Sequence, residues 1–440
     1  NISTDTRSIK KGDLFIALKG KNFDGHNFLH EAFLKGAVAA IVSEGKYKSF
    51  PLMIVQDTLK ALHDMASYYI RNVLIDAKVI AVTGSVGKTT TKDMLHTVLS
   101  QYGVSHASEG NLNNNIGLPL TILKAPKNCQ YLILEMGMNK VGEIKELSKI
   151  SNPNIAVITN IEPAHTENFS SLFDVAQAKL EILYGMKNNG TLVLSRDNKY
   201  YDYLSSHANR NVISFGKDKN AEVCLLNLIR NGAGMTSNRV ANRLSLKIRL
   251  SDNQIINCNL RVQGEHFAYS LLAVAAVVQS LGLDLSKLPL ALKNFSVAKG
   301  RGNIHKVKCN KKYIHLIDDS YNASPASMKT AIKTLSTYSN QRKVALLGDM
   351  LELGDESIEF HTDLVKIITE NNIDKVYTVG KFMLELHELL PDNIRGTHFN
   401  DSNQLKSDLA NIIQNNDAIL VKGSRGMKMD LIVREFVIKY

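Results

Sequence analysis

A run of small and hydroxyl-bearing residues at 79–94, VIAVTGSVGKTTTKDM, has the composition of a loop that binds phosphate. Small residues let backbone N–H groups turn toward phosphate oxygens, and the N-terminus of a following helix adds partial positive charge. Lys88 would supply a point charge and Thr89 a hydroxyl ligand for Mg²⁺. Standard loops of this kind have four residues between their glycines, whereas Gly84 and Gly87 enclose two. The run is therefore either a chance turn or a shortened phosphate-binding loop.

Two further groups that can bind metal follow the next two predicted strands. Glu135 ends the segment YLILE, and the segment ITNIEPAHTENF holds Asn160 and His165. Taken singly, the glutamate is more consistent with an ordinary exposed carboxylate and the histidine with a surface or core residue. Because the carboxyl ends of parallel strands meet at one edge of a sheet, the three motifs together predict one crevice for a nucleotide.

Strands alternate with helices along most of the chain, which predicts an α/β fold with mainly parallel sheets. Residues 1–76 form a small α/β unit, and residues 77–297 hold the phosphate loop, further strands such as IAVIT and TLVLS, and an apolar closing helix. A third, Rossmann-like series with strands such as YIHLID and KVALLGD occupies residues 298–440. We therefore predict three domains in this 440-residue chain.

The composition excludes several classes of protein. The longest apolar run, at 271–278, is far shorter than the ~18–20 residues of a membrane-spanning helix, so we expect no membrane insertion. The net charge of +11 invites a nucleic-acid interpretation, but the basic residues are spread along the chain without a nucleic-acid-binding motif, and we expect no such partner. The four cysteines form no CxxC pair and the start shows no secretory pattern, which together favour the cytoplasm.

Five motifs resemble the central domain of the Mur ligases, which join amino acids or peptides to a UDP-linked muramic acid. They are VTGSVGKTTTK, EGNLNNNIGLPLTIL, LEMGMNKVGEI, TNIEPAHTENF and AQAKLEIL. The short phosphate loop matches this family's own TGxxGKT form. The resemblance covers nearly the whole chain and implies an ATP-dependent ligase.

Other motifs indicate a branch of the family, namely DTRSIKKGDLFIALKGKNFDGHNF, DDSYNASPASM, LLGDMLELG and KGSRGMKMD. They resemble the ligase that adds D-alanyl-D-alanine (D-Ala-D-Ala) to UDP-N-acetylmuramoyl-tripeptide (UDP-MurNAc-tripeptide) in peptidoglycan precursor synthesis. A MurE-type enzyme would show a DYAH-type stretch in place of DDSYN. MurE and folylpolyglutamate synthase remain the nearest alternatives, and a P-loop switch or nucleic-acid-stimulated ATPase is the alternative from another class.

The resemblance implies that the central domain binds ATP and two Mg²⁺ ions and makes an acyl phosphate. The implied ATP-binding residues are Gly84, Ser85, Val86, Gly87, Lys88, Thr89 and Thr90, with Arg301 and Asp319 from the third domain. The implied metal ligands are Thr89, Glu135, His165 and Lys179, the last as a carbamate formed with CO₂. Lys88, Glu135, His165 and Lys179 would be the catalytic residues. The alternatives are a hinge charge for Arg301, a helix cap for Asp319 and a solvated helix lysine for Lys179.

The other two substrates have implied residues as well. Thr6 and Arg7 match an element that approaches UDP, and Asn113 and Asn114 match a segment along the muramoyl-peptide channel, for which a plain turn is the alternative. The weaker candidates for the D-Ala-D-Ala side are Asn322, Lys422, Ser424 and Arg425. We expect the enzyme to be a monomer.

One position departs from the family. The pattern G-x-H-x-x-x-N, which places an Asn near adenine, reads GEHFAYS here, so that Gly264 and His266 match but Ser270 replaces the Asn. A hydroxyl cannot make the paired donor and acceptor contact of an amide. Adenine recognition at this position is therefore in doubt.

Overall fold

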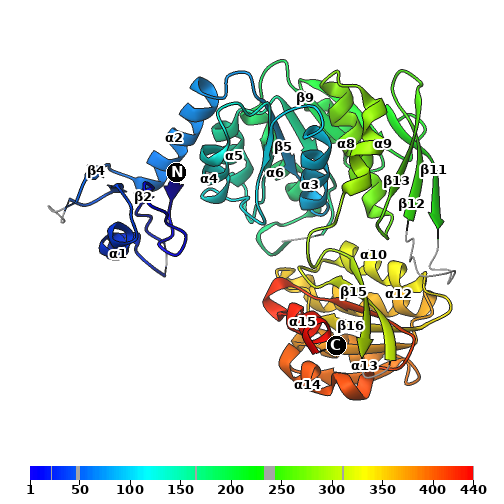
Figure 1. The fold of residues 1–440 in the computed structure, drawn as a ribbon. Helices are drawn as coiled ribbons and strands as arrows, with labels where there is room; N and C mark the ends of the chain where they lie inside the picture. Colours follow the sequence, from blue (N-terminus) through cyan, green and yellow to red (C-terminus); the bar gives the residue numbers. More distant parts are fainter. Residues whose placement is uncertain (21, 46–49, 164–165, 232–242, 310–311, 440) are drawn as a thin grey trace.

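The computed structural model describes residues 1–20, 22–45, 50–163, 166–231, 243–309 and 312–439. In these ranges the chain forms a 4-stranded, a 9-stranded and a 6-stranded sheet, one after another along the sequence. Each sheet belongs to its own lobe (Figure 1). The predicted α/β class with three domains is confirmed.

The N-terminal lobe is a small parallel sheet with strands in chain order. Its elements are β1 (Ile2–Ser3), β2 (Leu14–Ile16), η1 (Gly25–Phe28), α1 (Leu29–Leu34), β3 (Ala39–Val42), β4 (Leu52–Ile54) and α2 (Thr58–Asn72). Helix α2 begins where the Asp57 carboxylate accepts hydrogen bonds from two backbone N–H groups of its first turn. Leu62 packs in the core of the N-terminal lobe, whereas Ala66 and Ile70 pack in the core of the central lobe. The helix therefore fastens the two lobes together.

The central lobe has the strand order β13-β12-β11-β10-β9-β8-β5-β7-β6. Its parallel strands are β5 (Lys78–Thr83), β6 (Ser105–Ala107), β7 (Tyr131–Glu135), β8 (Ile155–Ile158), β9 (Thr191–Ser195), β10 (Asn211–Gly216) and β11 (Val223–Asn231). The antiparallel strands β12 (Arg243–Arg249) and β13 (Ile255–Leu260) extend one edge. Strand β5 is buried on both faces, as its apolar sequence favours.

Helices cover both faces of this sheet (Figure 1). The core on one face is built with α3 (Lys88–Leu99) and α8 (His266–Ser280). Helix α8 is buried on nearly all of its faces, which explains why almost its entire sequence is apolar. The opposite core includes α4 (Gly117–Lys124), α5 (Glu143–Ser151) and α6 (Leu172–Leu180). The smaller helices of the lobe are η2 (Thr166–Asn168), η3 (Glu181–Tyr184), α7 (Tyr201–Ser206), η4 (Leu285–Lys287), α9 (Leu288–Ala291) and η5 (Leu292–Asn294).

The C-terminal lobe has the strand order β14-β15-β19-β16-β17-β18, with β14 antiparallel at its edge. The strands are β14 (Asn303–Cys309), β15 (Lys312–Asp319), β16 (Arg342–Gly348), β17 (Lys375–Val379), β18 (Arg395–Phe399) and β19 (Asp417–Lys422). The helices are α10 (Pro325–Ser336), η6 (Gly354–Glu356), α11 (Ser357–Thr362), α12 (Leu364–Glu370), α13 (Lys381–Leu389), α14 (Ser402–Ile412), η7 (Arg425–Met427) and α15 (Asp430–Lys439). The expected strands of the third domain are all present, while the domain boundaries stay a prediction.

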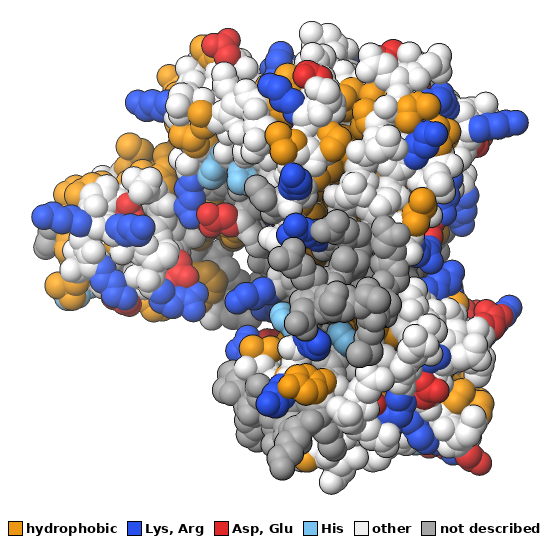
Figure 2. Space-filling view, turned by 45° about the vertical axis from the view of Figure 1, so that its right-hand side comes forward, with side chains coloured by type: hydrophobic (Ala, Val, Ile, Leu, Met, Phe, Trp, Pro, Cys, Tyr) orange, Lys and Arg blue, Asp and Glu red, His pale blue; other side chains and the backbone are white. Residues whose placement is uncertain are grey.

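Two observations concern the charged surface and the apolar helices. Lys and Arg side chains are scattered among other residues on the face shown in Figure 2. Among the described residues, no helix combines the length and the apolar character that crossing a membrane requires.

A buried ion pair joins the starts of two neighbouring strands of the C-terminal sheet. Arg342 donates from Nε and Nη2 to the two carboxylate oxygens of Asp417 at 2.8 and 2.7 Å, and Asp417 is fully buried. Replacing Arg342 by Met would leave this carboxylate buried without its cation. We expect Arg342→Met to lower the free energy of unfolding by about 3 kcal/mol, measured by urea denaturation.

The matched control is Arg434→Met. Arg434 pairs with Asp430 one helical turn away, and both side chains are substantially exposed, so the loss should be about 0.5 kcal/mol or less. Equal losses in the two variants would contradict the assignment of the Arg342 pair as a structural bridge.

Candidate functional site

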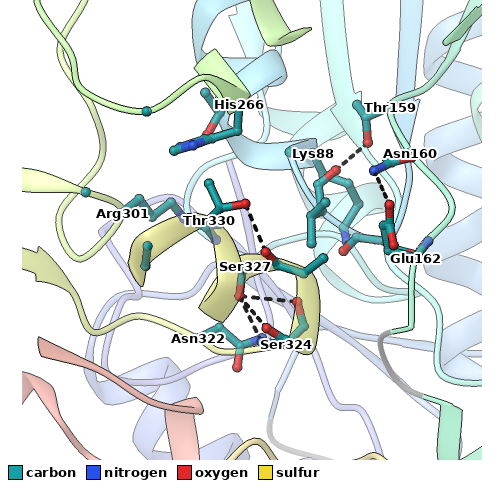
Figure 3. Close-up of a pocket in the computed structure, with 18 of the residues that line it drawn as sticks. Lys88, Thr159, Asn160, Glu162, His266, Arg301, Asn322, Ser324, Ser327 and Thr330 are labelled. Carbon is teal, nitrogen blue, oxygen red and sulfur yellow. Dashed lines mark hydrogen bonds between the residues drawn. The ribbon is translucent and has the colours of Figure 1, made fainter. Parts of the chain in front are cut away.

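A cavity of about 1170 Å³ lies between the central and C-terminal lobes (Figure 3). It brings together most of the residues singled out in the sequence, from the phosphate loop, the ends of β7 and β8, and the C-terminal lobe. These residues are Ser85, Val86, Gly87, Lys88, Thr89, Thr90, Asn113, Glu135, Asn160, Arg301, Asp319, Asn322, Lys422, Ser424 and Arg425. Thr6, Arg7, Gly84, Asn114 and Lys179 do not line it, and His165 lies outside the described residues.

The short phosphate loop lies directly against the end of β8. Gly84 has φ +146°, and a Cβ there would lie only 2.0 Å from the Thr159 hydroxyl oxygen. The Thr159 hydroxyl donates to the carbonyl of Val86 at 2.6 Å. Gly87 caps α3 in a left-handed conformation with φ +85°, which glycine adopts without strain. The loop therefore leads directly into the N-terminus of α3, where a phosphate is favoured.

Lys88 folds back over this loop. Its ammonium donates to the carbonyl of Gly84 at 2.8 Å and to that of Ser85 at 3.3 Å. Burial lowers the pKa of Lys88, Glu135 opposes this shift, and the charge of Arg301 adds to it. A bound phosphate would supply the negative charge that these carbonyl contacts lack.

Glu135 is 2% exposed and is held by two side chains. Its Oε2 accepts from the Thr89 hydroxyl at 2.9 Å, and its Oε1 accepts from the Asn113 amide at 2.8 Å. Hydroxyl and carboxylate oxygens are the ligands that Mg²⁺ prefers, so this pair fits one Mg²⁺ ion completed by water and phosphate oxygens. Among the described residues no group of three or more His, Cys, Asp and Glu is arranged to hold a metal by itself.

Lys179 lies on α6 with 4% of its surface exposed, so it is not a solvated helix lysine. Among the described residues, the one charge that acts on its ammonium is that of Lys88, and no carboxylate does. Burial and, secondarily, the charge of Lys88 hold the pKa of Lys179 well below its usual range. Burial therefore favours the uncharged form of this amine.

The C-terminal wall contains an ion pair between the buried Lys422 and the partly exposed Asp319. The Lys422 ammonium lies 2.6 Å from Oδ2 of Asp319 and donates to the carbonyl of Asn322 at 2.9 Å. Burial raises the pKa of Asp319, whereas the Lys422 charge lowers it. Asp319 is not a helix cap, because Ser324 is the N-cap of α10. The remaining candidates lie beside this pair, with the Ser424 hydroxyl accepting from the backbone of Leu351 at 2.8 Å and Arg425 exposed.

The residues outside the cavity have local partners. Arg7 pairs with Asp5 at 2.6 Å on the surface of the N-terminal lobe, next to the buried Thr6. The side-chain oxygen of Asn114 accepts from the backbone of Gly117 at 2.8 Å and so caps the start of α4. The roles of these residues toward UDP and the muramoyl peptide stay predictions.

The position expected to read adenine lies beside the phosphate loop. Ser270 is 4% exposed, and its hydroxyl oxygen is 4.0 Å from where a Cβ on Gly87 would lie. Burial, together with the charge of Lys422, lowers the pKa of His266 to about 4, so that this imidazole lines the cavity as a neutral ring.

Two residues of this site, Thr159 and Tyr321, were not predicted from the sequence. Thr159 holds the phosphate loop through its hydrogen bond to the carbonyl of Val86. The only indication of this role in the sequence is that Thr159 directly follows a buried strand. Tyr321 lines the cavity next to Arg301 and Arg425.

Comparisons with known proteins agree over the whole chain. The model "Mur ligase family, catalytic domain" matches residues 1–75, "Mur ligase middle domain" matches 82–278, and "Mur ligase, glutamate ligase domain" matches 300–425. The UDP-N-acetylmuramoyl-tripeptide–D-alanyl-D-alanine ligase of Buchnera aphidicola subsp. Baizongia pistaciae is 38% identical, covering 100% of this chain and 93% of that protein.

Solved structures of MurF are similar to this chain over nearly its whole length. The crystal structure of MurF from Acinetobacter baumannii has a TM-score of 0.88 at 31% identity, covering 99% of this chain and 92% of that one. MurF ligase from Thermotoga maritima in complex with ADP has a TM-score of 0.84 at 29% identity, covering 99% and 96%.

The close contact between Gly84 and Thr159 leaves no room for a side chain at position 84. In Gly84→Ala the new Cβ would overlap the Thr159 hydroxyl, so the loop must move. We expect ATP binding, measured by calorimetry, to weaken at least ~10-fold and the free energy of unfolding to fall by about 3 kcal/mol.

Gly282→Ala is the control, because Gly282 also has a positive φ, +66°, but no heavy atom within 4 Å of the new Cβ. It should cost about 1–2 kcal/mol of stability and leave ATP affinity unchanged. Normal ATP binding by a folded Gly84→Ala variant would show that the close contact is not needed.

Proposed function

The chain belongs to the Mur ligase family, and we propose that it catalyses the ATP-dependent addition of D-Ala-D-Ala to UDP-MurNAc-tripeptide. The observation that carries this proposal is a relative with that activity in its name, 38% identical over the full length of this chain. The cavity supports it, because a phosphate loop, a buried carboxylate and several cations face one another there.

The reaction must activate a carboxylate before an amine can attack it. The terminal carboxylate of the tripeptide attacks the γ-phosphorus of ATP, and ADP leaves, which gives an acyl phosphate. The uncharged amine of D-Ala-D-Ala then attacks the carbonyl carbon. The tetrahedral intermediate expels phosphate, and the nitrogen loses a proton as the amide forms. The protein mainly has to position the reactants and stabilise negative charge.

The described residues divide these tasks. The backbone of the phosphate loop and Lys88 bind the ATP phosphates, with Arg301 facing them from the C-terminal lobe. Thr89 and Glu135 would hold one Mg²⁺, which supplies charge neutralisation on the phosphate oxygens. The second Mg²⁺, expected near His165 and Lys179, belongs to the same proposal.

Carbamylation of Lys179 is part of the proposal. A neutral amine is the form that adds CO₂, and burial lowers the pKa of Lys179 and so favours that form. The amine nitrogen bonds to the carbon of CO₂ and releases one proton, so that an uncharged amine becomes an anionic oxygen ligand. A carbamate also removes the repulsion between two lysines in one low-dielectric site.

The lobes receive separate roles. We assign UDP-sugar binding to residues 1–76, ATP binding to 77–297, and binding of D-Ala-D-Ala with closure on ATP to 298–440. We place the enzyme in the cytoplasm, which suits the free, buried state of Cys129, Cys224 and Cys258. A single chain holds all the described site residues, which supports a monomer.

Product analysis tests the function directly. With ATP, UDP-MurNAc-tripeptide and D-Ala-D-Ala, we expect mass spectrometry to find the pentapeptide product together with ADP and phosphate. Lys88→Ala should lose at least ~10²-fold in rate, because charge stabilisation at such sites is worth several kcal/mol. Coupling of free lysine or diaminopimelate to the dipeptide precursor would instead establish the MurE-type activity, and polymer-stimulated ATP hydrolysis would establish a motor.

A second test concerns Lys179. We expect ¹³C-labelled bicarbonate to give a carbamate resonance in the unmodified enzyme and none in Lys179→Ala, which should be severely impaired. Activity should fall when bicarbonate is stripped and return on its addition. Lys92, which is equally buried but donates to the carbonyl of Ser108 at 2.7 Å, should stay unlabelled. Full activity of Lys179→Ala would refute the role, and indifference to bicarbonate would leave an unmodified amine.

A further inference from the structure

Two guanidinium groups share one aromatic ring in the wall of the cavity. The guanidinium carbon of Arg301 lies 4.1 Å from the centre of the Tyr321 ring, and that of Arg425 lies 5.2 Å from it. Both distances are within the range in which a cation is attracted to an aromatic face. Arg301 follows the central lobe in the chain, whereas Arg425 follows β19. The ring therefore connects two segments that are far apart in the sequence.

The backbone holds this ring in place. The N–H of Tyr321 donates to the carbonyl of Gly300 at 3.0 Å, and the N–H of Gly300 donates to the buried carboxylate of Asp318 at 3.1 Å. Gly300 has φ +76°, and a Cβ there would lie 3.1 Å from the Cβ of Tyr321. The tyrosine is thus fixed to the segment that carries Arg301.

Neither guanidinium group is paired with a residue that the structure describes. In the described part of the chain, Arg301 and Arg425 donate hydrogen bonds only from their backbone N–H groups, to Asn303 and Asn322 at 3.4 Å each. A guanidinium group has five N–H donors with a geometry suited to phosphate and carboxylate. Two unpaired cations on one ring also repel each other, so the arrangement favours bound anions on both.

The surroundings distinguish the two groups. The charge of Arg301 lowers the pKa of Lys88 in the phosphate loop and opposes the rise in the pKa of Asp319. Arg425 is more exposed, follows Ser424 in the chain, and donates from its backbone to Asn322. Arg301 is therefore the guanidinium that acts electrostatically on the phosphate loop, and Arg425 is the one more open to solvent.

We infer that Tyr321 is a positioning residue that couples the binding of two anionic substrates, by holding Arg301 toward the ATP phosphates and Arg425 toward the C-terminal carboxylate of D-Ala-D-Ala. This inference rests on the proposed function. An anion on either arginine reduces the repulsion between them and leaves the other better ordered on the ring. Binding of one substrate then strengthens binding of the other, by the same factor in both directions.

The test compares Tyr321→Leu with Tyr321→Phe. Phenylalanine keeps the aromatic face and leucine does not, while no hydrogen bond of the Tyr321 hydroxyl to a described residue is lost in either variant. We expect Tyr321→Leu to raise KM for ATP and KM for D-Ala-D-Ala about tenfold each, with a much smaller effect on kcat. Tyr321→Phe should stay within about twofold of the unmodified enzyme. In calorimetry, D-Ala-D-Ala should tighten the binding of a non-hydrolysable ATP analogue to the unmodified enzyme and to Tyr321→Phe, but not to Tyr321→Leu.

Tyr313→Leu is the matched control. The Tyr313 ring also carries two cations, Lys306 at 5.9 Å and Lys308 at 5.8 Å, but it is half exposed and does not line the cavity. Neither KM should change in this variant, and thermal unfolding should show that all three variants are folded.

Several results would overturn the inference. Equal impairment of Tyr321→Phe and Tyr321→Leu would exclude the aromatic face as the cause, and a rise in only one KM would exclude the coupling. Failure of the proposed function has a different signature, because the unmodified enzyme would then form no pentapeptide product. In that case ATP-analogue binding without an acceptor would still test the Arg301 side, and equal affinities for Tyr321→Leu and Tyr321→Phe would refute it.

Discussion

The contact between the phosphate loop and the end of β8 is the constraint on which the site depends. Gly84 has no side chain, and a Cβ at this position would lie only 2.0 Å from the Thr159 hydroxyl oxygen. Since β5 lies between β7 and β8 in the sheet, the loop also meets Glu135 from the other neighbouring strand. One edge of the sheet therefore positions the phosphate loop, Glu135 and Thr159, as expected for ligand sites in parallel sheets.

Several cations that line the cavity have no carboxylate partner among the described residues. Lys422 is neutralised by Asp319, but Lys88 donates to carbonyls alone, and Arg301 and Arg425 have no carboxylate partner among the described residues. Desolvation disfavours such unpaired cations. ATP, with several negative charges, would remove this cost. The unpaired cations are therefore unfavourable in the free protein and become favourable when phosphate is bound.

Much of this arrangement could be predicted from the sequence, because it depends on local patterns. The strand-turn-helix at Gly84 to Lys88, the carboxylate ending β7 and the alternation of strands and helices are all visible in short windows. The antiparallel β12 and β13 were not predicted, although LSLKIRL has the alternation of a half-buried strand. Pairings between distant residues could not be read from the sequence. Lys422 and Asp319 are 103 positions apart, and whether they meet depends on the order of strands in the sheet.

The departure at Ser270 has a consequence for how the nucleotide is held. The serine lies against the phosphate loop and offers a single hydroxyl, and His266 beside it is neutral because its pKa is about 4. Neutral groups of this kind can pack against a base but distinguish one base from another only weakly. The N-terminus of α3, Lys88 and Arg301, in contrast, offer positive charge to phosphate groups. Charge-assisted hydrogen bonds are about twice as strong as neutral ones, so in the proposed function the phosphates would contribute more to nucleotide binding than the base, and the arginines at the Tyr321 ring would matter more than Ser270.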